Sequence, residues 1–443
     1  RSTPKPSSAA SDVYKRQILL IITIFAISFS QEVHLKITDR AAERIRVAVM
    51  PFVEDPSSMG DLPSADSIDD IISADLDFSP FFTVLEPEFF PKIVTDEKDI
   101  MQSDWLTSGV QTIVFGTYGL AEGEACIYLK LYSVPNGKVI YKKTYRGLPE
   151  NLRRIAHAAS DDIVRKITGE KGIAQTKIAF ISSRSGNKEI YVCDYDGYNL
   201  TKLTSHKSII LSPDWSPDGT ALTFTSFLKG QPQLYIYEFA KGRARLLSGF
   251  SGLNTAASWS PDGKKIALVL SKDGNSEIYV MDVKKKKLKR LTKNFYIDTS
   301  PTWSPDGHYI AFCSDRSGTP QIYIMDSDGA NVRRLTFDGD YNDQPSWSPK
   351  GDKIAFASRT RGQFDIAVID VSGENLVYLT SLGNNEHPDW APDGYHIVFA
   401  SDRLGTYQIY EFLWDGTKIR RITNIAANNT SPSWSPRFNW GQE

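Results

Sequence analysis

Six tryptophans recur at nearly constant intervals along the chain, and this period constrains the fold more than any other feature. They lie 44, 44, 44, 43 and 44 residues apart, at Trp215, Trp259, Trp303, Trp347, Trp390 and Trp434. The first five are followed by Ser-Pro or Ala-Pro and then by a turn dipeptide, Asp-Gly in four periods and Lys-Gly at 350–351. The sixth is followed by Ser-Pro-Arg. A period of roughly 40 to 50 residues is typical of β-propeller blades.

Each period also contains two apolar runs between its tryptophans. In one period these runs are residues 310–312 and 322–326, separated by a polar turn at 314–318. A short segment then ends in Leu335-Thr336. Alternating β-branched and aromatic residues bounded by Gly, Pro, Asp and Ser indicate strands and turns. We therefore predict four antiparallel strands per period, which make one blade.

The two ends of the repeat predict how the ring closes. Residues 177–204 contain both apolar runs of a blade without a preceding tryptophan strand, whereas Trp434 has no apolar run behind it. The Trp434 strand is therefore expected to pair with the run at 177–180, so that an otherwise open sheet edge is covered. The prediction is an all-β six-bladed propeller over residues 177–443.

The first 30 residues carry the pattern of an export signal. An apolar run at 18–27 follows Lys15 and Arg16 and precedes Ser28-Phe29-Ser30, as in a secretory signal peptide. We expect cleavage after Ser30. The alternative is an uncleaved anchor, although the run is shorter than the roughly 20 residues that span a bilayer. Residues 1–16 include a Ser/Pro-rich stretch unlike a signal sequence and are interpreted as foreign sequence.

Residues 31–169 are predicted to form an α/β domain, joined to the propeller by a linker at 170–176. A strand at 46–52 precedes a helix that starts near Ser64. Strands at 112–118, 125–134 and 138–145 follow, the last two joined by a hairpin turn at 135–137. A final helix at 149–168 is ended by Gly169. Strands flanked by helices form a layered α/β unit.

Charge and cysteine content exclude some functions. The chain has 51 basic and 53 acidic residues, and loss of residues 1–30 would make it more acidic, so a general nucleic-acid binder is not expected. The run Lys284, Lys285, Lys286 and Lys287 is interpreted as a solvated turn. The three cysteines, Cys126, Cys193 and Cys313, cannot all pair with one another. Cys193 and Cys313 lie in strands of different blades and are expected to be buried free thiols. Since no cysteine follows the signal run, lipid attachment there is not expected.

A family resemblance rests on the junction between the two predicted domains. The residues at 157–163, 168–172 and 177–180 read His-Ala-Ala-Ser-Asp-Asp-Ile, Thr-Gly-Glu-Lys-Gly and Lys-Ile-Ala-Phe. Together with Val-Met-Pro-Phe at 49–52, Ser-Ala-Asp-Leu at 73–76, Gly-Thr-Tyr at 116–118 and the six Trp periods, this junction resembles the TolB family, periplasmic propeller proteins of the Tol-Pal system. The resemblance covers nearly the whole chain after residue 30.

The resemblance implies a binding protein of the periplasm that is not an enzyme and has no cofactor or metal. Family members bind the lipoprotein Pal at one mouth of the propeller channel and TolA through the segment after signal cleavage. The implied role is support of outer-membrane integrity and of envelope constriction in cell division. Outer-membrane proteins are further candidate partners. We expect a monomer that neither binds nucleic acid nor inserts into a membrane.

The loops that enter the tryptophan strands are expected to ring the channel mouth and to bind Pal. Rigidly held loops are natural binding surfaces. The candidate residues are Leu253, Asn254, Ala256, Asp298, Thr299, Ser300, Asn342, Asp343, Glu386 and His387, with Thr255, Asn428 and Asn429 beside them. Ala256 and Thr299 match partner-contacting positions of the family, whereas Leu253 and Ser300 replace a His and a Glu that the family often has. The alternative is that these are solvated loops without a partner.

The segment after the expected cleavage site is the candidate TolA contact. It comprises Glu32, Val33, His34, Leu35, Lys36, Ile37 and Thr38. Its alternating apolar residues suit the addition of a strand to a sheet edge of the partner. The alternative is a strand of the chain's own α/β domain, and the two arrangements could alternate.

The competing function is a hydrolase or metal-dependent enzyme that works in the channel through carboxylates and His387. Four recurrent aspartates, Asp218, Asp262, Asp306 and Asp393, lie in Pro-Asp-Gly turns, where Asp and Gly shape the backbone. The chain has 6 His, without a pair at metal-ligand helix spacing. Propeller peptidases carry Gly-x-Ser-x-Gly on a hydrolase domain, and this sequence lacks that motif. The sequence therefore favours the binding protein.

Overall fold

The computed structural model describes residues 44–58, 60, 62, 67–360 and 362–438. The expected signal peptide, the stretch at 1–16 and the candidate segment 32–38 lie outside these residues. In the part of the chain that is described, no helix combines the length and the apolar character needed to cross a membrane.

The α/β domain contains one mixed sheet of six strands in the order β3-β1-β4-β5-β6, with β2 paired to β4. Strand β1 is parallel to β3 and β4, whereas β4, β5 and β6 form an antiparallel meander. The strands are β1 (Ile45–Val49), β2 (Val53–Glu54), β3 (Phe82–Val84), β4 (Thr112–Ala121), β5 (Glu124–Ser133) and β6 (Lys138–Gly147). The helices are α2 (Ile68–Phe78), α3 (Gln102–Thr107) and α4 (Leu152–Thr168), with 3-10 turns at Pro87–Phe89, Glu97–Asp99 and Pro149–Asn151. The sequence analysis missed β2, β3 and α3, which are too short to show a clear period.

Helices α2 and α4 begin and end where the sequence provides caps. The Ser67 hydroxyl accepts a hydrogen bond from the backbone N–H of Asp70 at the start of α2, and Asp69 and Asp70 in the first turn favour the helix dipole. Gly169 ends α4 with φ 80, a left-handed conformation that glycine adopts without a Cβ clash. The prediction that Gly169 ends this helix is confirmed.

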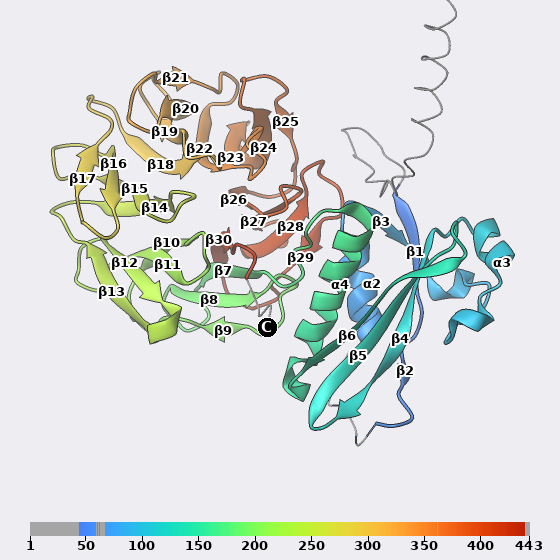
Figure 1. The fold of residues 1–443 in the computed structure, drawn as a ribbon. Coiled ribbons are helices and arrows are strands. Elements are labelled where there is room, and N and C mark those ends of the chain that lie inside the picture. The colour runs from blue at the N-terminus through green and yellow to red at the C-terminus, as the bar shows by residue number, and fades with distance from the viewer. Residues whose placement is uncertain (1–43, 59, 61, 63–66, 361, 439–443) are drawn as a thin grey trace, which may run out of the picture. The chain divides into compact units, whose positions relative to one another are not determined.

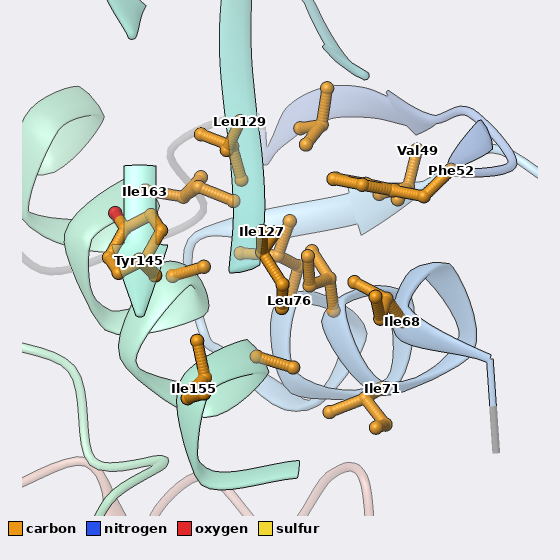
Figure 2. Close-up of a cluster of buried hydrophobic side chains, with 14 of the residues drawn as sticks. Val49, Phe52, Ile68, Ile71, Leu76, Ile127, Leu129, Tyr145, Ile155 and Ile163 are labelled. Atoms are coloured by element: carbon orange, nitrogen blue, oxygen red, sulfur yellow. The ribbon is translucent and has the colours of Figure 1, made fainter. Parts of the chain in front are cut away.

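The core of the α/β domain lies between its sheet and these two helices (Figure 2). Ile127 and Leu129 of β5 pack against Leu76 of α2 and Ile163 of α4, and all four side chains are fully buried. Burial of each such side chain stabilises the fold by about 1.5–3 kcal/mol. The two helices also contact each other, so that residues far apart in sequence form one layer.

Six four-stranded antiparallel sheets follow within the described residues, and they confirm the predicted six-bladed propeller (Figure 1). Blade 1 consists of β10 (Ile210–Trp215), β11 (Ala221–Ser226), β12 (Gln233–Glu238) and β13 (Arg243–Ser248). Blade 2 consists of β14 (Asn254–Trp259), β15 (Lys265–Leu270), β16 (Glu277–Asp282) and β17 (Leu288–Arg290). Blade 3 consists of β18 (Asp298–Trp303), β19 (Tyr309–Ser314), β20 (Gln321–Asp326) and β21 (Arg333–Arg334). Blade 4 consists of β22 (Tyr341–Trp347), β23 (Lys353–Thr360), β24 (Gln363–Asp370) and β25 (Val377–Tyr378). Blade 5 consists of β26 (Asn385–Trp390), β27 (His396–Ser401), β28 (Gln408–Leu413) and β29 (Arg420–Arg421). Blade 6 is β30 (Asn429–Trp434), β7 (Lys177–Ser182), β8 (Glu189–Asp194) and β9 (Thr201–Lys202).

The last strand closes the ring as the incomplete periods at the two ends of the repeat predict. Strand β30 pairs antiparallel with β7, with Trp434 opposite Ile178 and Asn429 opposite Ser182. The Trp434 indole N–H donates to the Thr176 hydroxyl over 2.8 Å, just before β7 begins. Blade 6 is therefore built from both ends of the propeller sequence.

The turn aspartates have the backbone role that their position predicts. The carboxylates of Asp218, Asp262, Asp306 and Asp393 each accept a hydrogen bond from the backbone N–H two residues later, at 2.9–3.0 Å. In the first three turns the carboxylate also accepts from the serine hydroxyl two residues earlier. These bonds fix the turn that leads from the tryptophan strand into the next strand.

Two smaller predictions are also confirmed. Cys193 and Cys313 are buried free thiols, as predicted. The lysine run at 284–287 is an exposed turn in which the Asp282 carboxylate accepts from the backbone N–H of Lys284 and Lys285.

Candidate partner-binding site at the channel mouth

The innermost strands of all six blades surround one cavity of about 150 Å³. Each of β10, β14, β18, β22, β26 and β30 contributes three consecutive residues to its wall. These strands begin at one face of the propeller, which we call the mouth face, and end at the tryptophan. Because β11 runs back so that Ser226 lies opposite Ile210, the loop after β11 also reaches the mouth face. The same holds in the other blades.

Every innermost strand has a β-bulge at the channel. The pairing register shifts at the same place in all six blades, and a residue with φ near +50 lies within each shift. These residues are Ser212, Ala256, Ser300, Gln344, His387 and Ser431. Proline follows in five blades and Ala257 in the other. A bulge leaves a residue outside the ladder, so a proline that lacks an N–H is tolerated there.

Hydrogen bonds across the channel wall join neighbouring blades. The Asp214 carboxylate of blade 1 accepts from the Trp259 backbone N–H of blade 2 over 3.0 Å. Asp389 of blade 5 accepts from the Trp434 backbone N–H of blade 6 over 2.7 Å and from the Ser346 hydroxyl of blade 4 over 2.9 Å. The wall is therefore a set of fixed positions that does not depend on loop conformation.

The structure corrects the expectation that the candidate residues lie in loops. Most of them are the first three residues of an innermost strand. Asn254 and Asp298 are the first residues of their strands, and Asn342 is the second residue of β22. The exposed fraction of each is 0%, so these side chains point away from the surface. Strand pairing buries these positions, which the sequence pattern alone did not reveal. These three side chains cannot touch a partner in this arrangement.

The three buried residues anchor the mouth instead of lining it. Asp298 accepts two hydrogen bonds from the Arg316 guanidinium, at 2.9 and 3.0 Å. The Asn254 amide donates to the carbonyls of Phe250 and Gly252, and the Asn342 amide donates to the carbonyl of Asp338. Hydrogen bonds from a buried side chain to a loop backbone restrain the geometry of that loop. These three residues would therefore affect partner binding indirectly, because they fix the position of the loops.

The other candidate residues lie at accessible positions. Ala256, Ser300 and His387 line the channel cavity, and Leu253 is exposed at the entrance. Thr299 and Glu386 are the second residues of their strands, Asp343 is the third residue of β22, and all three are half-buried. The structure thus brings together residues of blades 2, 3, 4 and 5 around one opening.

His387 has a defined hydrogen-bond state in the channel wall. Its backbone N–H donates to the Gln344 side-chain oxygen over 2.7 Å, so the Gln344 amide nitrogen, 3.2 Å from the His387 Nε2, must be the donor to the ring. Nε2 is then an acceptor and the ring is neutral. Burial lowers the pKa of His387 to about 4, which agrees with a neutral ring.

Two channel carboxylates, Asp214 and Asp389, were missed by the sequence analysis. Burial raises the pKa of Asp389 to about 6, against the effect of the hydrogen bonds that it accepts. Burial and the nearby charge of Asp389 raise the pKa of Asp214 well above its usual value. The available signal was their position: each stands directly before a tryptophan where the other blades have Ser or Thr.

A set of exposed apolar side chains on the mouth face was also missed. They lie in the loops that lead into the innermost strands and after the second strand of blades 1 and 5: Ile209, Leu228, Phe250, Leu253, Phe295, Tyr296, Ile297, Phe337, Leu382 and Leu404. We call these ten residues the apolar rim. Phe295 is fully exposed, and Phe337 is 72% exposed. Large exposed apolar groups that gather on one face are typical of protein-binding surfaces.

Side chains that could bind a metal ion do not cluster in the part of the chain that the structure describes. Among the described residues, no group of three or more His, Cys, Asp or Glu side chains is arranged to hold a metal ion.

Comparison with known families decides the classification. Residues 164–392, more than half of the chain, match the TolB beta propeller domain, and residues 33–140 match the TolB amino-terminal domain. The chain belongs to the TolB family. The order of the two matched domains is the order of the α/β domain and the propeller in the structure.

Individual TolB proteins show the extent of the similarity. The Tol-Pal system protein TolB of Geobacter sulfurreducens is 40% identical over 211 residues, which are 46% of this chain and 48% of that protein. TolB of Geobacter metallireducens is 42% identical over 215 residues, 46% of this chain and 49% of that protein. These alignments span about half the length of the curated relatives. The crystal structure of TolB from Acinetobacter baumannii matches with a TM-score of 0.80 at 28% identity, over 89% of this chain and 98% of that chain.

Proposed function

We propose that this TolB-family chain is a periplasmic, non-enzymatic component of the Tol-Pal system that binds the lipoprotein Pal at the mouth face of its propeller. In this proposal TolA is bound by the segment 32–38. The protein would thereby support outer-membrane integrity and constriction of the envelope during division. The observation that carries the proposal is the apolar rim around a channel whose wall is fixed in all six blades.

The geometry supports a protein partner in two ways. A rigid frame loses little conformational entropy on binding, which favours affinity. The apolar rim supplies aromatic anchors, the residue class that contributes most at hot spots of protein interfaces. Half-buried polar residues at the opening, such as Thr299 and Asp343, would add specificity by hydrogen bonds inside that rim.

Calorimetric titration with the soluble domain of Pal from the same organism tests the mouth face. Ala256→Arg and Asp343→Lys place bulk and reversed charge at the opening and should weaken binding at least tenfold. Phe295→Ala should weaken it by a similar factor if the apolar rim is in the interface. Matched controls are Ala330→Arg and Glu374→Lys, which lie in exposed turns at the opposite face of blades 3 and 4. Controls that weaken binding as much as the mouth variants would reject the site.

The TolA contact is tested by deletion of residues 32–38. The deletion should abolish binding of the TolA C-terminal domain while the affinity for Pal and the thermal midpoint of the propeller stay near those of the parent. Binding of TolA that survives the deletion would reject this part of the proposal without touching the Pal site.

A further inference from the structure

Two histidines lie buried between the α/β domain and the propeller, and each faces two hydrogen-bond acceptors. His157 of α4 has Nδ1 2.7 Å from an Asp75 carboxylate oxygen of α2 and Nε2 3.2 Å from an Asp196 carboxylate oxygen in the loop after β8. A neutral imidazole carries one N–H, so it can donate to only one of two carboxylates. The Nδ1 contact is a hydrogen bond, whereas the Nε2 contact is an ion-pair distance without hydrogen-bond geometry. Two carboxylates against one buried ring favour an imidazolium at His157.

His396 of β27 repeats this arrangement from the propeller side. Its Nδ1 lies 2.6 Å from the Asp393 carboxylate, and its Nε2 lies 3.1 Å from the backbone carbonyl of Phe78 at the end of α2. Both partners are acceptors, since a carbonyl has no proton to give. His396 must therefore carry two protons in order to donate to Asp393 and to Phe78 at the same time. The two rings together hold α2 and α4 to blades 5 and 6.

The charged and titratable groups around each ring are identified by their contacts. Asp75 also accepts from the Tyr195 hydroxyl, and Arg153 of α4 pairs with Asp196. His396 lies near Glu411 of β28, which is paired with Arg420 of β29. The Arg420 guanidinium lies 4.0 Å from the Phe78 ring centroid and 4.9 Å from that of Tyr195, so it joins the two sets of contacts.

The electrostatic balance favours the charged rings. Burial opposes a charge on His157, but the carboxylates of Asp75 and Asp196 outweigh it and raise the pKa of the ring to about 10. Burial likewise opposes the charge on His396, and Asp393 and Glu411 raise its pKa above the usual value. By contrast, His308 lies 3.1 Å from Asp306 at a surface where its side chain is 76% exposed, so solvent screens that pair.

We propose that docking of the α/β domain onto blades 5 and 6 is proton-linked: the interface closes with His157 and His396 doubly protonated, and loss of either proton releases it. Deprotonation of His157 would remove the positive charge between Asp75 and Asp196, which would then keep only Tyr195 and Arg153 as partners. At His396 the remaining proton would stay with the Asp393 carboxylate, so the bond to Phe78 of α2 would be lost. The fraction of molecules in which the α/β domain is docked on the propeller would then depend on pH. It does not depend on which partners the protein binds.

The direction of the effect follows from linkage. A ring whose pKa is higher in the docked than in the undocked state stabilises the docked state fully below the undocked pKa, and this contribution is lost as the pH rises through the docked value. For His157 the docked value is about 10. Asp75 belongs to the same domain as His157 and stays beside it on undocking, so the window begins at an undocked pKa above the ordinary 6.5. Within it, the ratio of docked to free domains should fall about tenfold per pH unit for each ring that ionises.

The test uses the full chain after removal of the signal region, with fluorescent labels at Lys142→Cys in β6 and Lys285→Cys in blade 2, in a Cys126→Ser background. Both lysines are exposed. Energy transfer between the labels should be constant near pH 7 and should change as the pH rises toward 10. His157→Gln should lower the docked fraction at pH 7 and reduce the pH dependence. The matched control His308→Gln should follow the parent at every pH.

Nitrogen chemical shifts of the two rings in the unmodified chain provide a second measurement that does not depend on the variants folding. Both rings should show imidazolium shifts at pH 8. Neutral rings at pH 8 would overturn the proposal. So would unchanged energy transfer up to pH 10.5 while circular dichroism shows both domains folded.

Discussion

Gly172 lies where the linker passes against α4, and its missing side chain is required there. A Cβ at this position would lie 2.1 Å from the Asp161 Oδ1 and 2.8 Å from the Asp161 Cα. The Asp161 carboxylate accepts hydrogen bonds from the backbone N–H of Ala174, at 2.8 Å, and of Gln175. Any side chain at 172 would displace the group that fixes the linker.

We therefore expect Gly172→Ala to lower the free energy of unfolding by about 1–3 kcal/mol, as overpacking does. Gly147→Ala is the control, because the new Cβ would meet only the flexible end of the Ile155 side chain, at 3.1 Å. Urea denaturation of both variants measures the difference. Equal losses would show that the contact with Asp161 is not the cause.

The channel carboxylate Asp389 predicts an unusual pH dependence. Since its pKa is raised to about 6, the folded state favours the neutral acid, and the stabilisation present below the free pKa near 3.8 is lost as the pH rises through about 6. Asp389→Asn should therefore gain stability relative to the parent at pH 8, on the order of 1–2 kcal/mol, but not at pH 4.

The exposed turn residue Asp218 provides a control of opposite sign. Its pKa is lowered despite the effect of burial, because Ser216 and Thr220 donate to its carboxylate. Asp218→Asn should therefore lose stability at pH 8 and little at pH 4. Thermal midpoints at the two pH values decide the matter, and a loss at pH 8 for both variants would contradict the prediction for Asp389.

At the scale of elements, strand β30 determines whether the propeller is a closed ring. Trp434 and Trp259 occupy equivalent positions, but the Trp434 indole donates to Thr176, whereas the Trp259 indole nitrogen is buried without a partner among the described residues. Substitution by Phe removes the same atoms from each. Trp434→Phe should cost about 1 kcal/mol more than Trp259→Phe, the net value of one hydrogen bond. Calorimetry of the two variants would contradict this if the losses were equal.

The strands of the propeller could be predicted because residues recur there at a fixed interval. The six tryptophans and the mismatch between residues 177–204 and Trp434 predicted four strands per blade and the closing strand, because both follow from spacing alone. The same reasoning placed Asn254 and Asp298 in exposed loops, where the structure has buried strand residues. Which face of a strand is covered depends on the neighbouring loop and blade, and a single sequence does not encode that locally.

At the scale of the whole molecule, Arg437 joins the linker to blade 5. Its guanidinium donates to the carbonyls of Gly172 and Lys171 in the linker and of Pro392 in blade 5, each over 2.8 Å. Arg437→Met should loosen the α/β domain from the propeller and split one calorimetric transition into two. Arg421→Met is the control, because Arg421 donates to a single carbonyl, that of Thr423, within blade 5. A single transition in the Arg437 variant would contradict the prediction.

Long-range polar contacts of this kind could not be predicted from the sequence. The junction residues 157–163 and 168–172 supported the family resemblance, yet their roles became clear only when Asp75, Asp196 and Arg437 were found beside them. These partners lie far away in sequence and have no periodic pattern. The mouth face shows the same limit, because Asp214 and Asp389 meet only when the ring is closed.

Closure by β30 also has a consequence for the order of events during synthesis. Protein chains emerge from the ribosome N-terminal end first. Strands β7, β8 and β9 are made before any other part of the propeller, but their fourth strand, β30, is made after the other five blades. Until β30 is made, blade 6 has an unpaired edge at β7, on which other chains can add strands. A nascent chain that stalls before Asn429 is therefore an open, aggregation-prone ring however well its other five blades have folded.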